Sequence, residues 1–252
     1  MASKPVFIFL PGAWHSPSIY DAVISKLSNH GYTSQALPLQ AILAKPAVTT
    51  LQPDIDALNT AVRSQAEAGN DVIVVGHSWS GIIVGGALEN LSKKSREKEG
   101  KKGGVVSLAY IAAFVPMEGV GLVQAFGGEV PPFYEVEKPW VTPFGPPGPI
   151  PLFYHDLPTP QAELWTSRLA PHSYATKFLG TESCSWREIP SSYLLCEDDR
   201  AIPPPVQKAM VEACKKQGAS MDVSGLMSSH SPFLSKVDET VTWLRGVAGE
   251  NI

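Results

Sequence analysis

A serine stands between small residues at the point where an apolar run of the chain ends. The residues DVIVV at 71–75 are followed by the motif GHSWSG at 76–81 and then by further small and apolar residues. This order predicts a strand, a tight turn and a helix, the geometry that lifts a nucleophilic serine above a sheet. We predict Ser78 as that nucleophile. Ser80 is a poor alternative, because the apolar strand would then end too early.

A serine hydroxyl attacks a carbonyl group readily only when a base takes its proton and a third group orients that base. A carboxylate and a histidine follow Ser78 in this order along the chain, each on a loop after an expected strand. We predict Asp199 as the orienting acid and His230 as the base. Asp198 is the alternative acid, because the ends of elements are predicted only to within about two residues.

Two backbone amides are needed to stabilise the oxyanion that forms when the serine attacks. Trp79, the residue after the nucleophile, supplies one N–H in this geometry. The second is expected at Ala13, in the turn PGAWH at 11–15 that follows the first apolar run, where Gly12 allows a close approach. The sequence therefore predicts an oxyanion hole formed by Ala13 and Trp79.

The remaining histidines carry less information. His77 lies on the elbow itself and is expected to pack there. His15, His30, His155 and His172 are expected to be surface residues or hydrogen-bonded core residues. His15 also follows the oxyanion turn closely enough to be a candidate pocket residue.

These motifs together resemble the α/β-hydrolase superfamily, in particular its compact branch of plant methylesterases, hydroxynitrile lyases and related bacterial and fungal esterases. The similarity runs nearly from end to end and includes LPGAWH at 10–15, GHSWSG at 76–81, AYIAAFVP at 109–116, EDDRAIP at 197–203 and HSPF at 230–233. Two positions depart from the pattern: Pro11 replaces a more usual histidine, and Ser80 replaces a glycine. The resemblance implies an α/β-hydrolase fold with a Ser-His-Asp triad.

The resemblance also separates two activities of this branch. Its hydroxynitrile lyases typically carry a lysine after the catalytic histidine and a hydroxyl side chain in the oxyanion turn. The matching positions here are Ser231 and Gly12. The resemblance therefore favours hydrolysis of a carboxylic ester, a methyl ester or a lactone included, through an acyl-enzyme. A lyase or carbon–carbon bond-cleaving enzyme with the same triad is the alternative, and a ligand receptor with slow turnover is a third hypothesis.

Strands and helices alternate along the chain and position these residues. Expected strands lie at 6–10, 33–37, 71–75, 105–111, 191–196 and 220–223, and expected helices at 18–30, 53–68, 206–217 and 234–244. Such alternation predicts an α/β fold with a mainly parallel sheet and helices on both faces. The charge run at 93–102 is expected to be a solvated loop.

Residues 116–190 interrupt this alternation with prolines and aromatic side chains. We expect no strands there, and a loop of this length within a compact domain is usually functional. The resemblance implies a lid that covers Ser78 and is inserted into a core formed by residues 1–115 and 191–252. Apolar lid walls indicate an apolar or aromatic small-molecule substrate. The candidate pocket residues are Trp14, His15, Phe133, Trp140 and Phe153.

Composition excludes several classes of partner. Of the 252 residues, 44% are hydrophobic and 17% are charged, and the net charge of −4 gives no general attraction to nucleic acid or to an anionic membrane. No apolar run approaches the length of a membrane span, about 18 residues. The first expected strand begins close to the N-terminus, so we expect no signal peptide and a cytoplasmic protein.

Cysteine usage gives no sign of a metal site. Cys184, Cys196 and Cys214 lack metal-ligand spacing and are expected to be reduced thiols. Neither a metal nor a cofactor is expected, and the sequence leaves a homodimer open.

Overall fold

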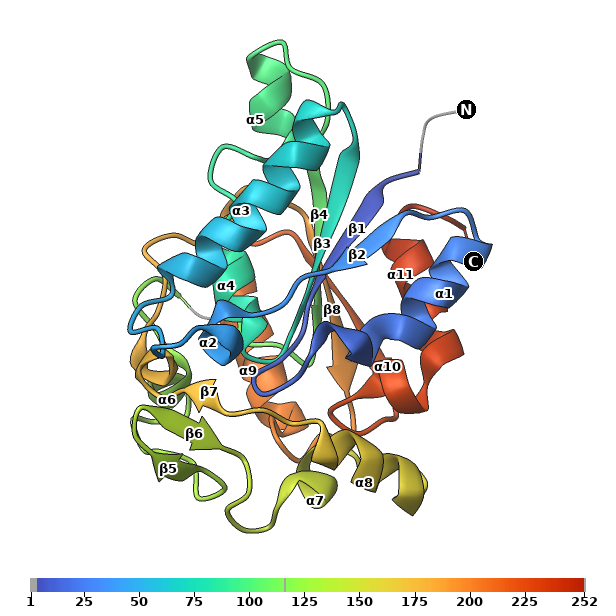
Figure 1. The fold of residues 1–252 in the computed structure, drawn as a ribbon. Helices are drawn as coiled ribbons and strands as arrows, with labels where there is room; N and C mark the ends of the chain where they lie inside the picture. Colours follow the sequence, from blue (N-terminus) through green and yellow to red (C-terminus); the bar gives the residue numbers. More distant parts are fainter. Residues whose placement is uncertain (1–3, 116, 252) are drawn as a thin grey trace.

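A six-stranded sheet forms the centre of the molecule (Figure 1). The computed structural model describes residues 4–115 and 117–251. The strand order is β2-β1-β3-β4-β8-β9, and each neighbouring pair is parallel. The strands are β1 (Val6–Leu10), β2 (Ser34–Ala36), β3 (Asp71–His77), β4 (Gly104–Ile111), β8 (Ser191–Cys196) and β9 (Met221–Leu226). The predicted mainly parallel sheet is thereby confirmed.

Helices cover both faces of this sheet, as predicted (Figure 1). One face carries α1 (Asp21–Asn29) and α11 (Val237–Val247), and the other carries α3 (Gln52–Glu67), α4 (Ser80–Gly86) and α9 (Pro204–Lys216). Alternate side chains of β1 point to opposite faces of the sheet. Phe7 and Phe9 pack with the first group of helices, and Ile8 and Leu10 pack with the second. A strand buried on both faces must be apolar throughout, which explains the uninterrupted apolar runs of the sequence.

Two expected helices are divided in the structure. The expected helix 18–30 is a 3₁₀ helix, η1 (Pro17–Tyr20), followed by α1. The expected helix 234–244 consists of α10 (Pro232–Ser235) and α11, separated at Lys236, whose backbone angles (φ −130°, ψ 52°) are not helical. A short helix that the sequence analysis did not name, α2 (Gln40–Leu43), connects β2 to α3.

The charge run at 93–102 is predicted to be a solvated loop, and this prediction is wrong for residues 93–98. Residues 99–102 are exposed and lie outside any helix or strand. Its first part forms α5 (Lys93–Lys98), which begins where the Ser92 hydroxyl accepts the Ser95 N–H at 3.1 Å. Arg96 is buried and donates to the backbone carbonyl oxygens of Gly103, Ala66 and Lys102 at 3.0, 3.1 and 3.2 Å. One arginine therefore anchors a segment whose other charges face solvent.

Residues 117–190 form an insert between the neighbouring strands β4 and β8, and it lies beyond the carboxyl ends of the central strands (Figure 1). The expectation of no strands there is wrong, because a small antiparallel sheet is present. Its strands have only two or three residues each, too few for a recognisable pattern. The insert contains α6 (Leu122–Ala125), β5 (Glu135–Glu137), β6 (Trp140–Thr142), α7 (Pro149–Phe153), α8 (Thr159–Ser167), β7 (His172–Ser173), η2 (Ala175–Phe178) and η3 (Ser185–Arg187).

Pro116, the first residue of the expected lid, lies outside the described residues. Within the described ranges, no helix has both the length and the apolar character to cross a bilayer.

Candidate active site

Ser78 occupies the sharp turn between β3 and α4. Its φ of 54° lies in the left-handed region, which a residue with a side chain adopts only where the surrounding structure enforces it. The surrounding contacts are hydrogen bonds from the Ser78 N–H to the Ile111 carbonyl at 3.3 Å and from the Phe114 N–H to the Ser78 carbonyl at 3.0 Å. The predicted strand–turn–helix arrangement around this serine is therefore present.

Small residues on both sides of Ser78 allow the strand and the helix to pass closely. A Cβ atom on Gly76 would lie 2.8 Å from Val84 Cγ2, and one on Gly81 would lie 2.0 Å from the Phe114 carbonyl oxygen. The position that cannot accept a side chain is therefore Gly81, three residues after Ser78. Ser80 is tolerated at the usual glycine position, where its hydroxyl donates to the Pro11 carbonyl and ties the elbow to the first turn.

The turn after β1 approaches the elbow through Gly12. A Cβ atom at Gly12 would lie 2.7 Å from His77 Nδ1 and 3.0 Å from Ser78 Cβ, so a larger residue cannot be placed there without a shift. Among the described residues, the backbone N–H groups of Ala13 and Trp79 donate to no protein acceptor. Both predicted oxyanion donors therefore flank the serine with free amides.

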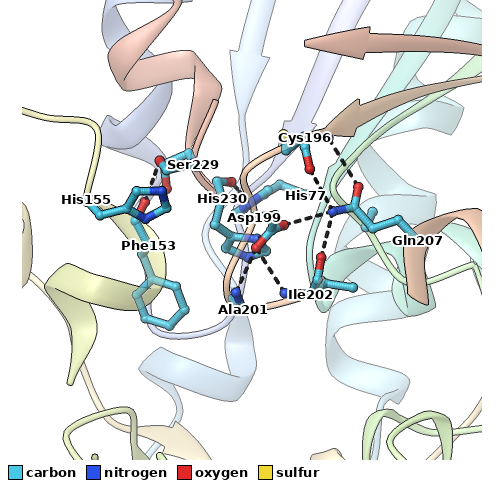
Figure 2. A network of polar contacts seen from close by, with 12 residues as sticks. His77, Phe153, His155, Cys196, Asp199, Ala201, Ile202, Gln207, Ser229 and His230 are labelled. Carbon is cyan, nitrogen blue, oxygen red and sulfur yellow. Dashed lines mark hydrogen bonds and ion pairs between the residues drawn. The ribbon is translucent and has the colours of Figure 1, made fainter. Parts of the chain in front are cut away.

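Asp199 and His230 form a buried hydrogen-bonded pair. His230 Nδ1 donates to Asp199 Oδ2 at 2.7 Å. The other carboxylate oxygen, Oδ1, accepts the backbone N–H groups of Ala201 at 2.8 Å and Ile202 at 3.0 Å (Figure 2). These donors fix the carboxylate and compensate for its burial. The loop after β8 thus presents one oriented carboxylate to the histidine.

Asp198, the alternative acid, is placed elsewhere. Its side chain is 51% exposed and lies 3.0 Å from His155 Nε2 and 3.9 Å from Arg200 Nε, whereas no ion pair joins it to His230. The choice between the two adjacent aspartates follows from β8 and its loop, which turn Asp199 inward and Asp198 toward the insert.

His77 connects the loop of His230 to the turn at Ser78. Its ring lies 4.5 Å from the ring of His230 and 4.8 Å from that of Phe233, measured between centroids, in agreement with the expected packing role. Burial lowers the pKa of His77 well below its ordinary value, so the ring is neutral. Its Nε2 donates to the His230 carbonyl at 2.9 Å. The loop of the base is therefore held directly against the residue that precedes Ser78.

His15 links the first turn to the insert. Burial lowers its pKa to about 3, so the imidazole is neutral and has one N–H. Nδ1 donates to the Ala13 carbonyl at 2.7 Å, and Nε2 accepts the Tyr154 hydroxyl proton at 2.5 Å. The Ala13 carbonyl thereby fixes the tautomer of His15, and the tyrosine of the insert donates to the remaining ring nitrogen.

Four of the five predicted pocket residues lie together. The Trp14 ring is 6.4 Å from that of Phe133 and 5.9 Å from that of Phe153, and Phe153 is also 5.7 Å from His15 and 5.6 Å from His230. Trp140 is the exception. It lies in β6, where its backbone pairs with β7, and no ring contact within the described ranges joins it to the other four.

A cavity of about 630 Å³ adjoins this aromatic group and the acid loop. Its walls are mainly apolar and include Phe126, Phe133, Leu152, Ala201 and Pro203, and two charged residues, Glu129 and Arg200, also line it. A second cavity of about 630 Å³, between α3, the end of α4 and residues 179–183, contains none of the predicted site residues. Ser78 and His230 line neither cavity, since both are buried.

Several contacts of the site could not be found from the sequence. Gln207 is fully buried in α9 and donates from Nε2 to Asp199 Oδ2 at 3.1 Å (Figure 2). Asp156 of the insert accepts the Ser229 N–H at 2.8 Å, beside the base. Lys177 of the insert is fully buried near Trp14. Asp156 and Lys177 lie far from their partners in the chain, Gln207 lies eight residues from Asp199 on the next helix, and none of the three belongs to a local motif.

Comparison with known proteins defines the class. A model of the alpha/beta hydrolase family matches residues 7–243, so the chain belongs to this family, and the predicted superfamily is confirmed. The chain is 32% identical over 258 residues to the alpha/beta hydrolase nvfD of Aspergillus novofumigatus (strain IBT 16806), a match that covers 99% of this chain and 98% of the relative.

Two further similarities involve esterases. The chain is 30% identical over 131 residues to the carbendazim hydrolyzing esterase of Nocardioides sp. (strain SG-4G), which covers 50% of this chain and 49% of that protein. The crystal structure of polyneuridine aldehyde esterase superposes with a TM-score of 0.75 at 18% identity and covers 97% of this chain and 99% of that one. At this identity the superposition establishes the shared fold.

Proposed function

We propose that this protein is a serine hydrolase that cleaves a carboxylic ester of a small apolar or aromatic molecule. The observation that carries the proposal is the buried hydrogen bond between His230 Nδ1 and Asp199 Oδ2, in a loop that His77 holds against the elbow. Because Nδ1 donates to the carboxylate, Nε2 of a neutral His230 remains an acceptor for the Ser78 proton. Similarity to proteins named esterases supports the same class of substrate.

In the proposed reaction, Ser78 Oγ attacks the acyl carbon while His230 Nε2 takes its proton. Asp199 keeps the ring in the required tautomer and stabilises the imidazolium. The carbonyl oxygen becomes an oxyanion and accepts the free N–H groups of Ala13 and Trp79. The alcohol leaves with the proton from His230. Water then attacks the acyl-enzyme by the same route and releases the acid.

The strained backbone of Ser78 supports its role as nucleophile. A φ of 54° costs of the order of 1 kcal/mol in a residue with a side chain, and such strain persists where the fold enforces it for a purpose. Gly12 and Gly81 provide the close contacts that this conformation needs. The proposed site thus combines a serine held on a sharp turn with preformed backbone donors.

We assign the insert as a lid over a core formed by residues 1–115 and 191–252. Trp14, Phe133 and Phe153 give the site aromatic walls, and the adjacent cavity of about 630 Å³ offers room for an apolar part of the substrate. Because the serine is buried, the lid must open for a substrate to enter. A methyl ester or a lactone fits the same chemistry.

The test is hydrolysis of short- and long-chain p-nitrophenyl esters by the wild type and four variants. Ser78→Ala and His230→Ala should lose activity by at least about a thousandfold, and Asp199→Asn by about a hundredfold or more. Asp198→Asn is the matched control, because it removes an adjacent carboxylate outside the pair, and it should stay within about threefold of the wild type. A folded wild type that is inert toward every ester would overturn the proposal and direct the search to lyase substrates and ligand binding.

A further inference from the structure

Lys177 is the most unusual charged residue of the insert. It lies in η2 with a fully buried side chain, and its Nζ forms no hydrogen bond with any described protein group. Nζ lies 4.6 Å from the centroid of the Trp14 ring and 5.0 Å from that of the Trp79 ring. These two tryptophans belong to the oxyanion turn and to the elbow. A lysine amine therefore lies against the side chains of Trp79, one proposed oxyanion donor, and of Trp14, the residue after the other.

The protein does not compensate for the burial of this amine. Burial lowers the pKa of Lys177 well below its ordinary value. The charge of Asp54 acts to raise the pKa of Lys177. The Asp54 oxygens, however, accept the Gln40 and Ala41 N–H groups at 2.6 and 3.2 Å. Within the described residues, Asp54 forms no ion pair with the lysine. Burial also raises the pKa of Asp54 to about 6, so near neutral pH most of its carboxyl groups are still ionised. Contacts with two aromatic faces offset only part of the cost of removing an ammonium group from water.

Other unpartnered polar atoms gather at the same two tryptophans. His172 Nε2, Trp79 Nε1 and the Tyr134 hydroxyl are buried without a protein partner. The His172 ring lies 4.5 Å from that of Trp79, and the Tyr134 ring lies 5.5 Å from that of Trp14. Buried polar groups are nearly always hydrogen-bonded in native proteins. His172 Nδ1 donates to the Ser173 carbonyl at 3.3 Å, so Nε2 is an acceptor, whereas Trp79 Nε1 and the Tyr134 hydroxyl are donors without a protein acceptor. Two free donors beside the same tryptophans as the amine point to a ligand oxygen that accepts from them.

We propose that Lys177 determines specificity by binding a carboxylate of the substrate, so that the preferred ester also carries a free carboxylate group. This inference rests on the proposed function, because it places the second group of the same substrate. In this proposal the ester carbonyl binds the Ala13 and Trp79 amides, and the carboxylate binds Nζ beside the rings of Trp14 and Trp79. A bound carboxylate favours the protonated, charged form of the buried amine. This stabilisation of the complex is available only to a substrate that carries an anion.

Binding is measured first with Ser78→Ala, which cannot turn a substrate over by the proposed route. The probes are monomethyl adipate and its neutral partner dimethyl adipate, with affinity taken from calorimetry or from thermal shifts. We expect the half-ester to bind at least tenfold more tightly than the diester. In Ser78→Ala/Lys177→Met this ratio should fall to about one, whereas Ser78→Ala/Lys94→Met, which removes an exposed lysine, should keep it. Lys94→Met controls for the loss of one unit of net charge.

The outcomes separate the two proposals. Equal affinity for the two probes in Ser78→Ala overturns the role of Lys177 whatever the variants do. Loss of binding by the same factor for both probes in the Lys177→Met background also overturns it, because this result describes a packing residue. Lys177→Arg keeps a cation and should retain most of the preference if Lys177→Met misfolds. A clear preference together with an absence of all ester hydrolysis in the wild type would refute the esterase proposal alone.

Discussion

Gln207 Nε2 donates to the same carboxylate oxygen of Asp199 that accepts the proton of His230, at 3.1 and 2.7 Å. The amide of Gln207 also donates to the carbonyl oxygens of Ile202 at 2.7 Å and Cys196 at 3.3 Å. The first turn of α9 thus clamps both ends of the loop that carries the acid (Figure 2). A buried side chain with this many partners determines the position of the loop.

The first prediction concerns this clamp. Gln207→Leu should lower the unfolding free energy by about 1 to 3 kcal/mol, because it leaves buried acceptors without a donor. It should also lower kcat on an ester substrate, since Asp199 loses a fixed partner. Gln217→Leu, an exposed position at the end of the same helix, is the control and should change neither quantity. Denaturant unfolding and ester hydrolysis measure the two effects, and an unaltered kcat in a destabilised Gln207→Leu would show that the clamp serves stability only.

Local motifs were enough to predict the order and position of the central strands. The expected strands at 6–10 and 191–196 coincide with β1 and β8, and the uninterrupted apolar run of β1 is what a strand buried on both faces requires. The turn, the elbow and the two loops also lie where their motifs indicated. Each of these depends on a tight turn, whose sequence requirements are local.

Long-range contacts explain what the sequence could not provide. The helix in the charge run is held in place by Arg96, whose side chain donates to the carbonyl groups of Ala66 and Gly103. Trp140 looks like a pocket residue in an aromatic segment, but β6 carries it away from Trp14. Lys177 has no flanking pattern that distinguishes it from a surface lysine. Such residues acquire their surroundings only when distant segments meet.

The second prediction tests the spacing of the elbow. Gly81→Ala should destabilise the protein by about 2 kcal/mol or more and reduce activity, because its Cβ would lie 2.0 Å from the Phe114 carbonyl oxygen. Gly85→Ala in the same helix is a matched control. Its Cβ would meet only Thr181 Oγ1 at an ordinary 3.6 Å, so we expect stability equal to or up to about 1 kcal/mol above the wild type. Thermal unfolding distinguishes the pair, and equal losses in both would contradict the elbow geometry.

The third prediction concerns the link between the insert and the oxyanion turn. Tyr154→Phe removes the donor to His15 Nε2 and leaves a buried acceptor, at a cost of about 1 to 2 kcal/mol in stability. We also expect a lower kcat, because His15 restrains Ala13. Tyr174→Phe removes a hydroxyl of the insert away from this contact and should leave kcat within about twofold. Steady-state kinetics on one ester would disprove the link if the two variants behaved alike.

The fourth prediction is a pH dependence of stability. Burial lowers the pKa of His172 well below its ordinary value, so the unfolded chain binds a proton below about pH 6.5 that the folded protein does not. The unfolding free energy therefore falls as the pH falls, by up to about 1.4 kcal/mol per unit for this one group. Asp54, with its pKa raised to about 6, acts in the opposite direction between its unfolded and folded values.

The variant His172→Phe isolates that contribution. Between pH 7.5 and 5.5, its unfolding free energy should fall by about 1.4 kcal/mol less than that of the wild type, because the variant no longer gains the proton on unfolding. Urea denaturation at several pH values provides the comparison. Parallel curves for the two proteins would mean that the pKa of His172 is the same in the folded and unfolded states, against this prediction.

Covalent labelling tests the central claim most directly, namely that Ser78 is the nucleophile. The protein is treated with diethyl p-nitrophenyl phosphate, which transfers its phosphoryl group to an activated serine and releases p-nitrophenol, and the adduct is located by peptide mass spectrometry. We predict one adduct on the peptide that contains Ser78, none in Ser78→Ala, and much slower labelling in His230→Ala. A principal adduct on another residue, or undiminished labelling of Ser78→Ala, would contradict the account.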